Sequence, residues 1–186
     1  RRSSANEQLT ASTSAPASRC DSGGMIRAFI GLGSNLNDPQ RQIETAVRAL
    51  GELPRSALLA VSPLYQSLPW GDPNQDDFIN AVAMLDTELA ALPLLASLLE
   101  IERQQGRDRS AARRNGPRTL DLDLLLYGDQ TFDQPQLQLP HPRMHERAFV
   151  LLPLADVAPD LLIPGVGVVR SLLKLQFASL CWRLAS

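Results

Sequence analysis

The stretch Gly116-Pro117-Arg118-Thr119-Leu120-Asp121-Leu122-Asp123-Leu124-Leu125-Leu126-Tyr127-Gly128 alternates apolar and polar side chains. Leucines at 120, 122, 124 and 126 take every second position, which is the period of a β-strand with one buried face. Asp121 and Asp123 then share the opposite, more open face. Two ionised carboxylates about 7 Å apart repel by about 2 kcal/mol at an effective dielectric constant of ~20. A hard divalent cation ligated by oxygen would offset this cost, so the pattern predicts a metal site.

A cluster of arginines precedes this strand: Arg103, Arg107, Arg109, Arg113, Arg114 and Arg118. The guanidinium group presents a planar fork of donors that matches phosphate oxygens. Taken alone, the acidic pair is typical of a solvated sheet face and the arginine run is typical of a solvated helix or loop. Joined by a Gly-Pro turn, the two features indicate a site for a metal–polyphosphate complex.

Composition narrows the class of protein. The chain has 186 residues, a net charge of -2 and 20% charged residues, which favours one domain and argues against a general nucleic-acid binder. No apolar run reaches the ~18 residues of a membrane span. Cys20 and Cys181 are too few for a disulfide framework, and His141 and His145 lack the glutamate of a zinc-protease helix.

The chain divides into a leader and one domain. Residues 1–24 are rich in Ser, Thr and Ala, which predicts a disordered leader, an expression remnant or a transit peptide, and 25–186 form the domain. Strands are expected at 26–32, 57–65, 78–85, 119–127 and 137–139, and helices at 39–50, 93–105, 146–155 and 170–176. Residues 31–35 are expected to form a tight turn, because they lack the third glycine of a dinucleotide loop and the lysine of a Walker loop. This mixture predicts an α+β sandwich with a mostly antiparallel sheet covered by helices.

One buried amide suggests the second ligand. Asn80 interrupts the apolar strand 78–85, and a polar amide there needs hydrogen-bond partners. Aromatic residues such as Trp70, Phe78 and Phe149 are core residues by default. An asparagine among aromatic rings is also suited to a flat heterocycle that stacks and offers donor and acceptor edges.

Five segments of the sequence contain these features. The chain resembles the 6-hydroxymethyl-7,8-dihydropterin pyrophosphokinase family over residues 26–165, through Phe29–Leu36, Phe78–Ala81, Ile101–Arg107, Gly116–Asp123 and Pro140–Phe149. The resemblance implies a ferredoxin-like α/β/α fold and a diphosphotransferase (EC 2.7.6.3 type) of folate biosynthesis. It implies ATP, two Mg²⁺ ions, and transfer of the β,γ-pyrophosphoryl group to the pterin's hydroxymethyl oxygen with release of AMP. It further implies a cytoplasmic monomer without nucleic-acid or membrane partners.

The resemblance also implies residue roles. Asp121 and Asp123 would ligate both magnesium ions and act in catalysis with Arg107 and Arg118. The nucleotide would be bound by Glu102, Arg107, Arg109, Arg118, Leu124, His141 and Arg147. The pterin pocket would be formed by Ser67, Leu68, Trp70, Phe78, Asn80 and Phe149. The segment 106–117 would close over ATP and exclude water. At three positions, Asn115, Gln136 and Pro142, this chain has a residue that differs from those found in some members of the family. No single residue is assigned as general base, although Asp123 is a candidate.

Two other classes fit part of the pattern. A nucleotidyltransferase also uses a Gly-Ser turn and an Asp-x-Asp strand, but within one local unit, whereas Ser34 and Asp121 lie far apart in this sequence. A ferredoxin-like ligand-sensing or RNA-binding module would not need Asp121 and Asp123 together, and it should display surface aromatic residues for base stacking.

Overall fold

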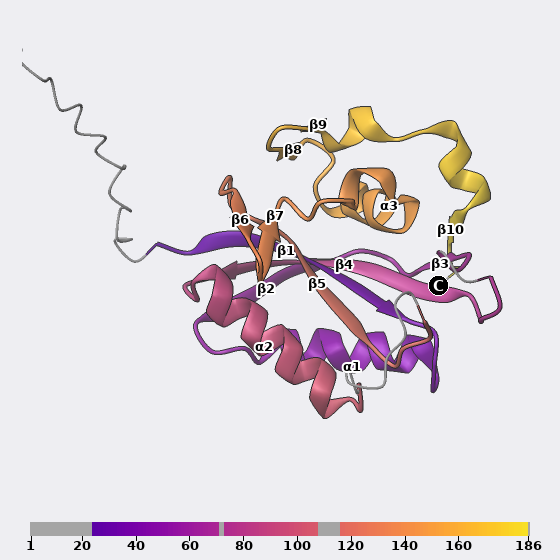
Figure 1. Cartoon of the computed structure of the whole chain (residues 1–186), viewed down its shortest axis with the longest axis horizontal. Helices are drawn as coiled ribbons and strands as arrows, with labels where there is room; N and C mark the ends of the chain where they lie inside the picture. Colours follow the sequence, from indigo (N-terminus) through magenta and orange to yellow (C-terminus); the bar gives the residue numbers. More distant parts are fainter. Residues whose placement is uncertain (1–23, 71–72, 108–115, 186) are drawn as a thin grey trace, which may run out of the picture.

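The computed structural model describes residues 24–70, 73–107 and 116–185, and it has three layers (Figure 1). The middle layer is a six-stranded sheet in the order β10-β3-β4-β1-β5, and β2 also pairs with β4. All of these pairings are antiparallel. The strands are β1 (Ile26–Ser34), β2 (Ser56–Val61), β3 (Tyr65–Ser67), β4 (Phe78–Thr87), β5 (Asp121–Tyr127) and β10 (Cys181–Arg183).

Helices cover both faces of this sheet. Figure 1 shows α1 (Pro39–Gly51) and α2 (Ala91–Gln104) on one face and α3 (Ala148–Val157) on the other. Two small hairpins and three short 3-10 segments complete the described elements: β6 (Phe132–Gln134) with β7 (Leu137–Leu139), β8 (Leu162–Ile163) with β9 (Gly167–Val168), η1 (Met144–Glu146), η2 (Val169–Leu172) and η3 (Leu175–Ser179). The order of β1, α1, β2, β4, α2 and β5 is that of ferredoxin-like domains, so the predicted α+β sandwich is confirmed.

Each face of the sheet has its own apolar core. Ile30 of β1, Leu85 of β4 and Leu122 of β5 pack with α1 and α2 in the first core. Phe29 of β1 and Val82 of β4 point to the other face and pack with α3 in the second core. Because neighbouring residues of a strand point to opposite faces, β1 and β4 contribute to both cores.

Strand β5 departs from simple alternation at Leu125. The pairing of β1 with β5 shifts there, because Ile30 lies opposite Leu124 while Phe29 lies opposite Leu126. Such a bulge adds one residue to a strand and turns the side chains that follow it. The prediction that Leu126 shares a face with Leu122 and Leu124 is therefore wrong, since Leu126 packs in the α3 core.

Other sequence predictions need correction. The strand expected at 57–65 is divided into β2 and β3 around Pro63, which has no N–H to donate. The helix expected at 170–176 is replaced by η2 and η3, and Leu175, the first residue of η3, is 99% exposed. The expected turn at 31–35 lies mostly inside β1, which continues to Ser34. The predicted leader falls almost wholly outside the described residues, and within those residues no helix is long and apolar enough to cross a membrane.

The C-terminal strand lies on the edge of the sheet beside β3. Cys181 pairs with Ser67, and the Leu68 N–H donates to the carbonyl of Leu180 at 3.2 Å. Of the three residues of β10, only Cys181 is buried. This strand therefore contributes little to the cores but fixes the backbone that follows β3.

Ending the chain at Ser179, which removes the Leu180 carbonyl together with β10, tests this arrangement. The shortened protein should fold. The Leu68 amide loses its hydrogen-bond acceptor, so it should exchange with solvent about tenfold faster. Hydrogen exchange measured by NMR gives both quantities. The Val82 amide, which bonds the Ser62 hydroxyl inside the sheet at 3.0 Å, is the control and should stay slow. An unchanged Leu68 rate would show that β10 does not protect β3.

Candidate active site

A pocket opens on the α3 side of the sheet, and its empty space, part of which is open solvent, is about 690 Å³. Strands β1, β4 and β5 form its floor, and the beginning of α3 forms one wall. Ten of the residues singled out from the sequence line it together: Ser67, Leu68, Trp70, Phe78, Asn80, Arg118, Asp121, Asp123, Arg147 and Phe149. Aromatic and amide side chains thus share one hollow with the carboxylate pair.

Several lining residues were not singled out as site residues from the sequence, namely Gly31, Leu32, Gly33, Ala81, Leu125 and Val150. Most are small or apolar, so their chemistry carries no signal. The spacing of Gly31 and Gly33 by two residues was a usable signal, because in a strand it places both on one face.

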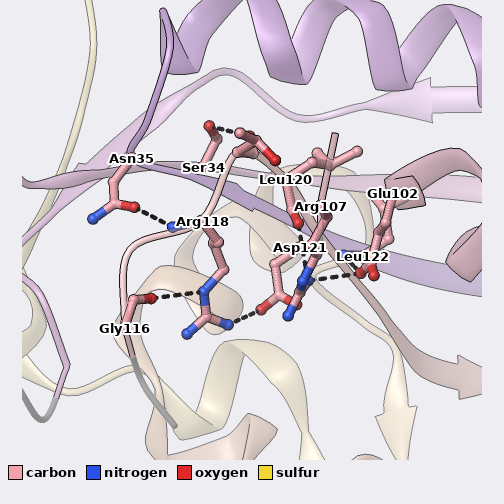
Figure 2. A network of polar contacts seen from close by, with 10 residues as sticks. Ser34, Asn35, Glu102, Arg107, Gly116, Arg118, Leu120, Asp121 and Leu122 are labelled. Carbon is pink, nitrogen blue, oxygen red and sulfur yellow. Dashed lines mark hydrogen bonds and ion pairs between the residues drawn. The ribbon is translucent and has the colours of Figure 1, made fainter. Parts of the chain in front are cut away.

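Asp121 is the centre of the polar network drawn in Figure 2. Its Oδ1 accepts a hydrogen bond from Arg107 Nη1, and its Oδ2 accepts one from Arg118 Nη1. Burial acts to raise the pKa of this carboxyl, but the charges and hydrogen bonds of Arg118 and Arg107 outweigh it and hold the pKa below its usual range. Asp121 is therefore ionised and firmly paired.

Glu102 supports this pair from α2. Its side chain is 1% exposed, and Oε1 accepts from Arg107 Nη1 at 2.8 Å and from the Leu122 N–H at 2.7 Å. A buried carboxylate needs such partners. Because one of them is the backbone of β5, Glu102 fixes both the arginine and the strand that carries Asp121 (Figure 2).

The end of β1 holds the other side of the network. The Asn35 Oδ1 accepts from the Arg118 N–H at 2.8 Å, and the Asn35 N–H donates to the Arg118 carbonyl at 3.1 Å. The Ser34 hydroxyl donates to the Thr119 carbonyl, and the Asn35 amide also donates to the Asp76 carbonyl at 3.0 Å. Ser34 and Asn35 therefore tie the residues before β5 to the loop before β4, and they do not act as a phosphate loop.

Asp123 differs from its neighbour. Burial and the negative charges of Asp121 and Glu102 outweigh the attraction of Arg147 and raise its pKa to about 7. Arg147 lies on the same side, with its guanidinium 5.6 Å from the centre of the Phe149 ring. Its Nε is buried and has no hydrogen-bond partner within the described part of the chain. Arg147 thus has a donor that the described part of the protein does not satisfy, and it lies near a carboxylate whose ionised form is disfavoured.

His141 lies beside β5, because its N–H donates to the Leu125 carbonyl at 2.9 Å. Burial and the charge of Arg147 lower its pKa to about 4. The imidazole is therefore neutral near pH 7, and it can donate or accept a hydrogen bond without adding charge.

The amide of Asn80 is fixed from the inner end of the pocket. Its Nδ2 donates to Ser67 Oγ at 3.0 Å and to the Phe78 carbonyl at 3.3 Å. The carbonyl oxygen of the amide is directed toward β1 and the pocket floor, beside Gly33. Arg118 lies over the Phe78 ring, 5.6 Å from its centre, which joins the aromatic and charged parts of the pocket.

Four of the predicted site residues that the structure describes do not line the pocket. Arg107 and Glu102 lie behind Asp121, His141 lies beside β5, and Leu124 packs in the core under α1 and α2. Leu124 alternates with Asp123, so its side chain points to the opposite face. Arg109 and Asn115, and with them most of the predicted closing segment 106–117, lie outside the described residues.

The donor set suits magnesium rather than zinc. In the described ranges no three His, Cys, Asp or Glu side chains gather as a metal cage. Asp121 and Asp123 supply two carboxylates. Mg²⁺ is characteristically held by one or two carboxylates, together with waters and the phosphates of a substrate. The residues present therefore fit an ion that arrives with a polyphosphate.

A three-layer α+β fold with a carboxylate pair between arginines and an aromatic, amide-lined pocket defines a class of small-molecule phosphotransferase. Residues 29–159 match the family model described as 7,8-dihydro-6-hydroxymethylpterin-pyrophosphokinase (HPPK). The chain belongs to this family. It is a diphosphotransferase of folate biosynthesis that transfers pyrophosphate to hydroxymethyldihydropterin, with ATP as co-substrate.

Curated relatives and solved structures agree with the family. The chain is 55% identical over 138 residues to a Pseudomonas aeruginosa 2-amino-4-hydroxy-6-hydroxymethyldihydropteridine pyrophosphokinase, covering 74% of this chain and 84% of the relative. It is 47% identical over 154 residues to the Haemophilus influenzae protein of the same name, covering 83% and 94%. A Plasmodium falciparum HPPK-DHPS structure with pterin and p-hydroxybenzoate has a TM-score of 0.64 and 15% identity, covering 86% of this chain and 44% of that chain, and it supports the fold alone.

The unequal environments of the two carboxylates predict opposite effects on stability. For Asp123 the pKa is 3.8 in the unfolded chain and about 7 in the folded protein without metal, so ionisation costs stability as the pH rises between these values. Asp123→Asn should therefore raise the melting temperature of the metal-free protein at pH 8, by about 2–4 °C for each kcal/mol recovered. Below about pH 4 the difference should vanish, because Asp123 is then protonated in both states.

Asp121→Asn is the matched comparison. It removes the acceptor charge from Arg107 and Arg118, so it should destabilise the protein at pH 8 by about 1–3 kcal/mol. Thermal unfolding of both variants across pH 3–8 measures the effects. Two variants that shift the melting temperature in the same direction at pH 8 would show that the carboxylates are in equivalent environments.

Proposed function

We propose that Asp121 and Asp123, together with two Mg²⁺ ions, hold the phosphates of ATP against the hydroxymethyl group of the bound pterin. The hydroxymethyl oxygen forms a bond to the β-phosphorus, the bond from that phosphorus to the oxygen bridging it to the α-phosphorus breaks, and AMP leaves. The observation that carries this proposal is that the carboxylate pair lines the same pocket as Asn80 and Phe149, while Arg107 and Arg118 donate hydrogen bonds to Asp121.

Asp121 and Asp123 are the residues that would hold the metal. When bound, Mg²⁺ neutralises charge on the transferring phosphates and holds donor and acceptor together. The uncompensated charge of Asp123 favours this role, because a cation relieves the repulsion from Asp121 that raises its pKa. The hydroxyl proton passes to water or to Asp123, and we assign no single general base.

The arginines would bind the phosphates. Arg147 supplies a buried Nε without a partner in the described structure, and a phosphate oxygen is the acceptor that would satisfy it. Arg118 lies between the aromatic pocket and Asp121, so it can contact the phosphate chain near the acceptor. Neutral His141 would add a hydrogen bond without competing with the metal for charge. Arg107 and Glu102 act from behind by holding Asp121 and β5.

The pterin would lie in the aromatic half of the pocket. The ring would lie between Phe78 and Phe149, which both line the pocket, and the carbonyl of the Asn80 amide would accept from an N–H on its edge. Ser67 matters indirectly, because it holds the other end of the amide at 3.0 Å. A site that hydrogen-bonds its substrate rejects analogues without that group strongly.

The enzyme acts as a cytoplasmic monomer on small molecules, without nucleic-acid or membrane partners. The net charge of -2 supports the absence of a nucleic-acid partner, since such binders carry a basic excess. We also propose that the segment 106–117, which includes Arg109, closes over ATP, as the sequence predicts.

One assay tests the reaction. Incubated with Mg²⁺, ATP and 6-hydroxymethyl-7,8-dihydropterin, the protein should produce AMP and the pterin diphosphate, both measured by chromatography. Omission of Mg²⁺ should abolish both products. Release of pyrophosphate would instead indicate a nucleotidyltransferase, and binding of the pterin without turnover would indicate a sensing module.

Replacing Asp123 tests the role of the carboxylate pair. Asp123→Ala should lower the rate by at least about 100-fold, because it removes a metal ligand at the transferring phosphates. Pterin binding, measured by fluorescence titration, should stay largely intact. Asp133→Ala, which removes an exposed carboxylate on β6, should keep the parent rate. A near-parent rate for Asp123→Ala would remove Asp123 from the metal site.

A further inference from the structure

Two glycines occupy the middle of the central strand β1. Gly31 pairs with Val82 on β4 and Asp123 on β5, and Gly33 pairs with Asn80 and Asp121. Glycine in a strand interior weakens the strand, since it packs no side chain and loses more entropy on folding. Neither residue has the positive φ that would require glycine. The backbone conformation of β1 therefore does not account for them.

The missing side chains would point into the pocket, which both glycines line. A Cβ on Gly33 would lie 3.5 Å from Asn80 Oδ1 and 3.9 Å from Asp121 Cβ. A Cβ on Gly31 would meet the Leu125 side chain at 3.4–3.6 Å. These are ordinary van der Waals separations, so the protein without substrate has room for either methyl group. Tight packing of the protein itself is thus no reason for a glycine at 33.

We propose that Gly33 is a specificity-determining residue, whose absent side chain leaves the floor between Asn80 and Asp121 open for the acceptor. The inference rests on the proposed function, because Asn80 holds the edge of the heterocycle and Asp121 holds the metal. A ring that reaches from one to the other must cross the backbone of β1 at Gly33. A methyl group there lifts the ring from the floor and moves its hydroxymethyl oxygen away from the phosphates.

A role of Gly33 in acceptor binding can be distinguished from a role in folding. A glycine kept for the fold should destabilise the protein when it is replaced. Here alanine meets no contact shorter than 3.5 Å and restricts the unfolded chain, so it should leave the melting temperature unchanged or raise it. Stability and acceptor binding should therefore respond to the same substitution in different ways.

The test compares Gly33→Ala, Gly31→Ala and Gly51→Ala with the parent enzyme. In Gly33→Ala we expect a KM for 6-hydroxymethyl-7,8-dihydropterin that is about tenfold to a hundredfold higher, the effect of one methyl group in a fitted pocket. The KM for ATP should stay within about twofold, and the melting temperature should not fall. Gly31→Ala should raise the pterin KM less, because its methyl group contacts Leu125 and not the space between Asn80 and Asp121.

Gly51→Ala is the control, since a Cβ at the end of α1 meets only Leu58 at 3.8 Å, and both KM values should be unchanged. An unchanged pterin KM in folded Gly33→Ala would overturn the inference, as would a fall in melting temperature with unchanged binding. An effect of Gly31→Ala as large as that of Gly33→Ala would overturn the assignment to Gly33. A parent enzyme that does not use the pterin would instead overturn the proposed function, so the two failures are distinguishable.

Discussion

Two carboxylates on one face of a strand repel each other, and the active site is organised around how unequally that repulsion is resolved. Asp121 is paired with Arg107 and Arg118, which are held in turn by Glu102 on α2 and by Asn35 after β1. Within the described residues Asp123 has no comparable neutralisation, and its pKa rises to about 7. Asp121 is thus held by the protein around it, while Asp123 is the carboxylate whose ionised form is disfavoured.

This organisation depends on the division of the sheet into two faces. Leu122 and Leu124 join β5 to the core beneath α1 and α2, so the strand that carries the carboxylates is rigid. The bulge at Leu125 then turns the end of the strand so that Leu125 and Leu126 pack under α3. The same short strand therefore carries a polar site at one end and closes the second core at the other. A rigid, buried support of this kind suits a reaction that depends on positioning more than on covalent chemistry.

The pocket contains residues whose placement lowers the stability of the fold. A buried donor of Arg147 lacks a partner within the described structure, two glycines interrupt the central strand, and Asp123 is held in an unfavourable environment. Proteins keep such features at sites where a ligand completes them. All three features occur around one hollow, as the proposed binding of phosphates, metal and heterocycle would require.

The sequence by itself determined the elements and their chemistry. The alternation of leucine and aspartate in 119–125 placed Asp121 and Asp123 on one face, and the run of arginines before them indicated phosphate. Local patterns could do this because side-chain direction within a strand follows from its period. Only the tertiary structure decided that the first strand continues through Gly33, that Leu126 faces α3 and that Glu102 bonds β5. Each of these depends on register and packing between segments distant in sequence, which no local pattern encodes.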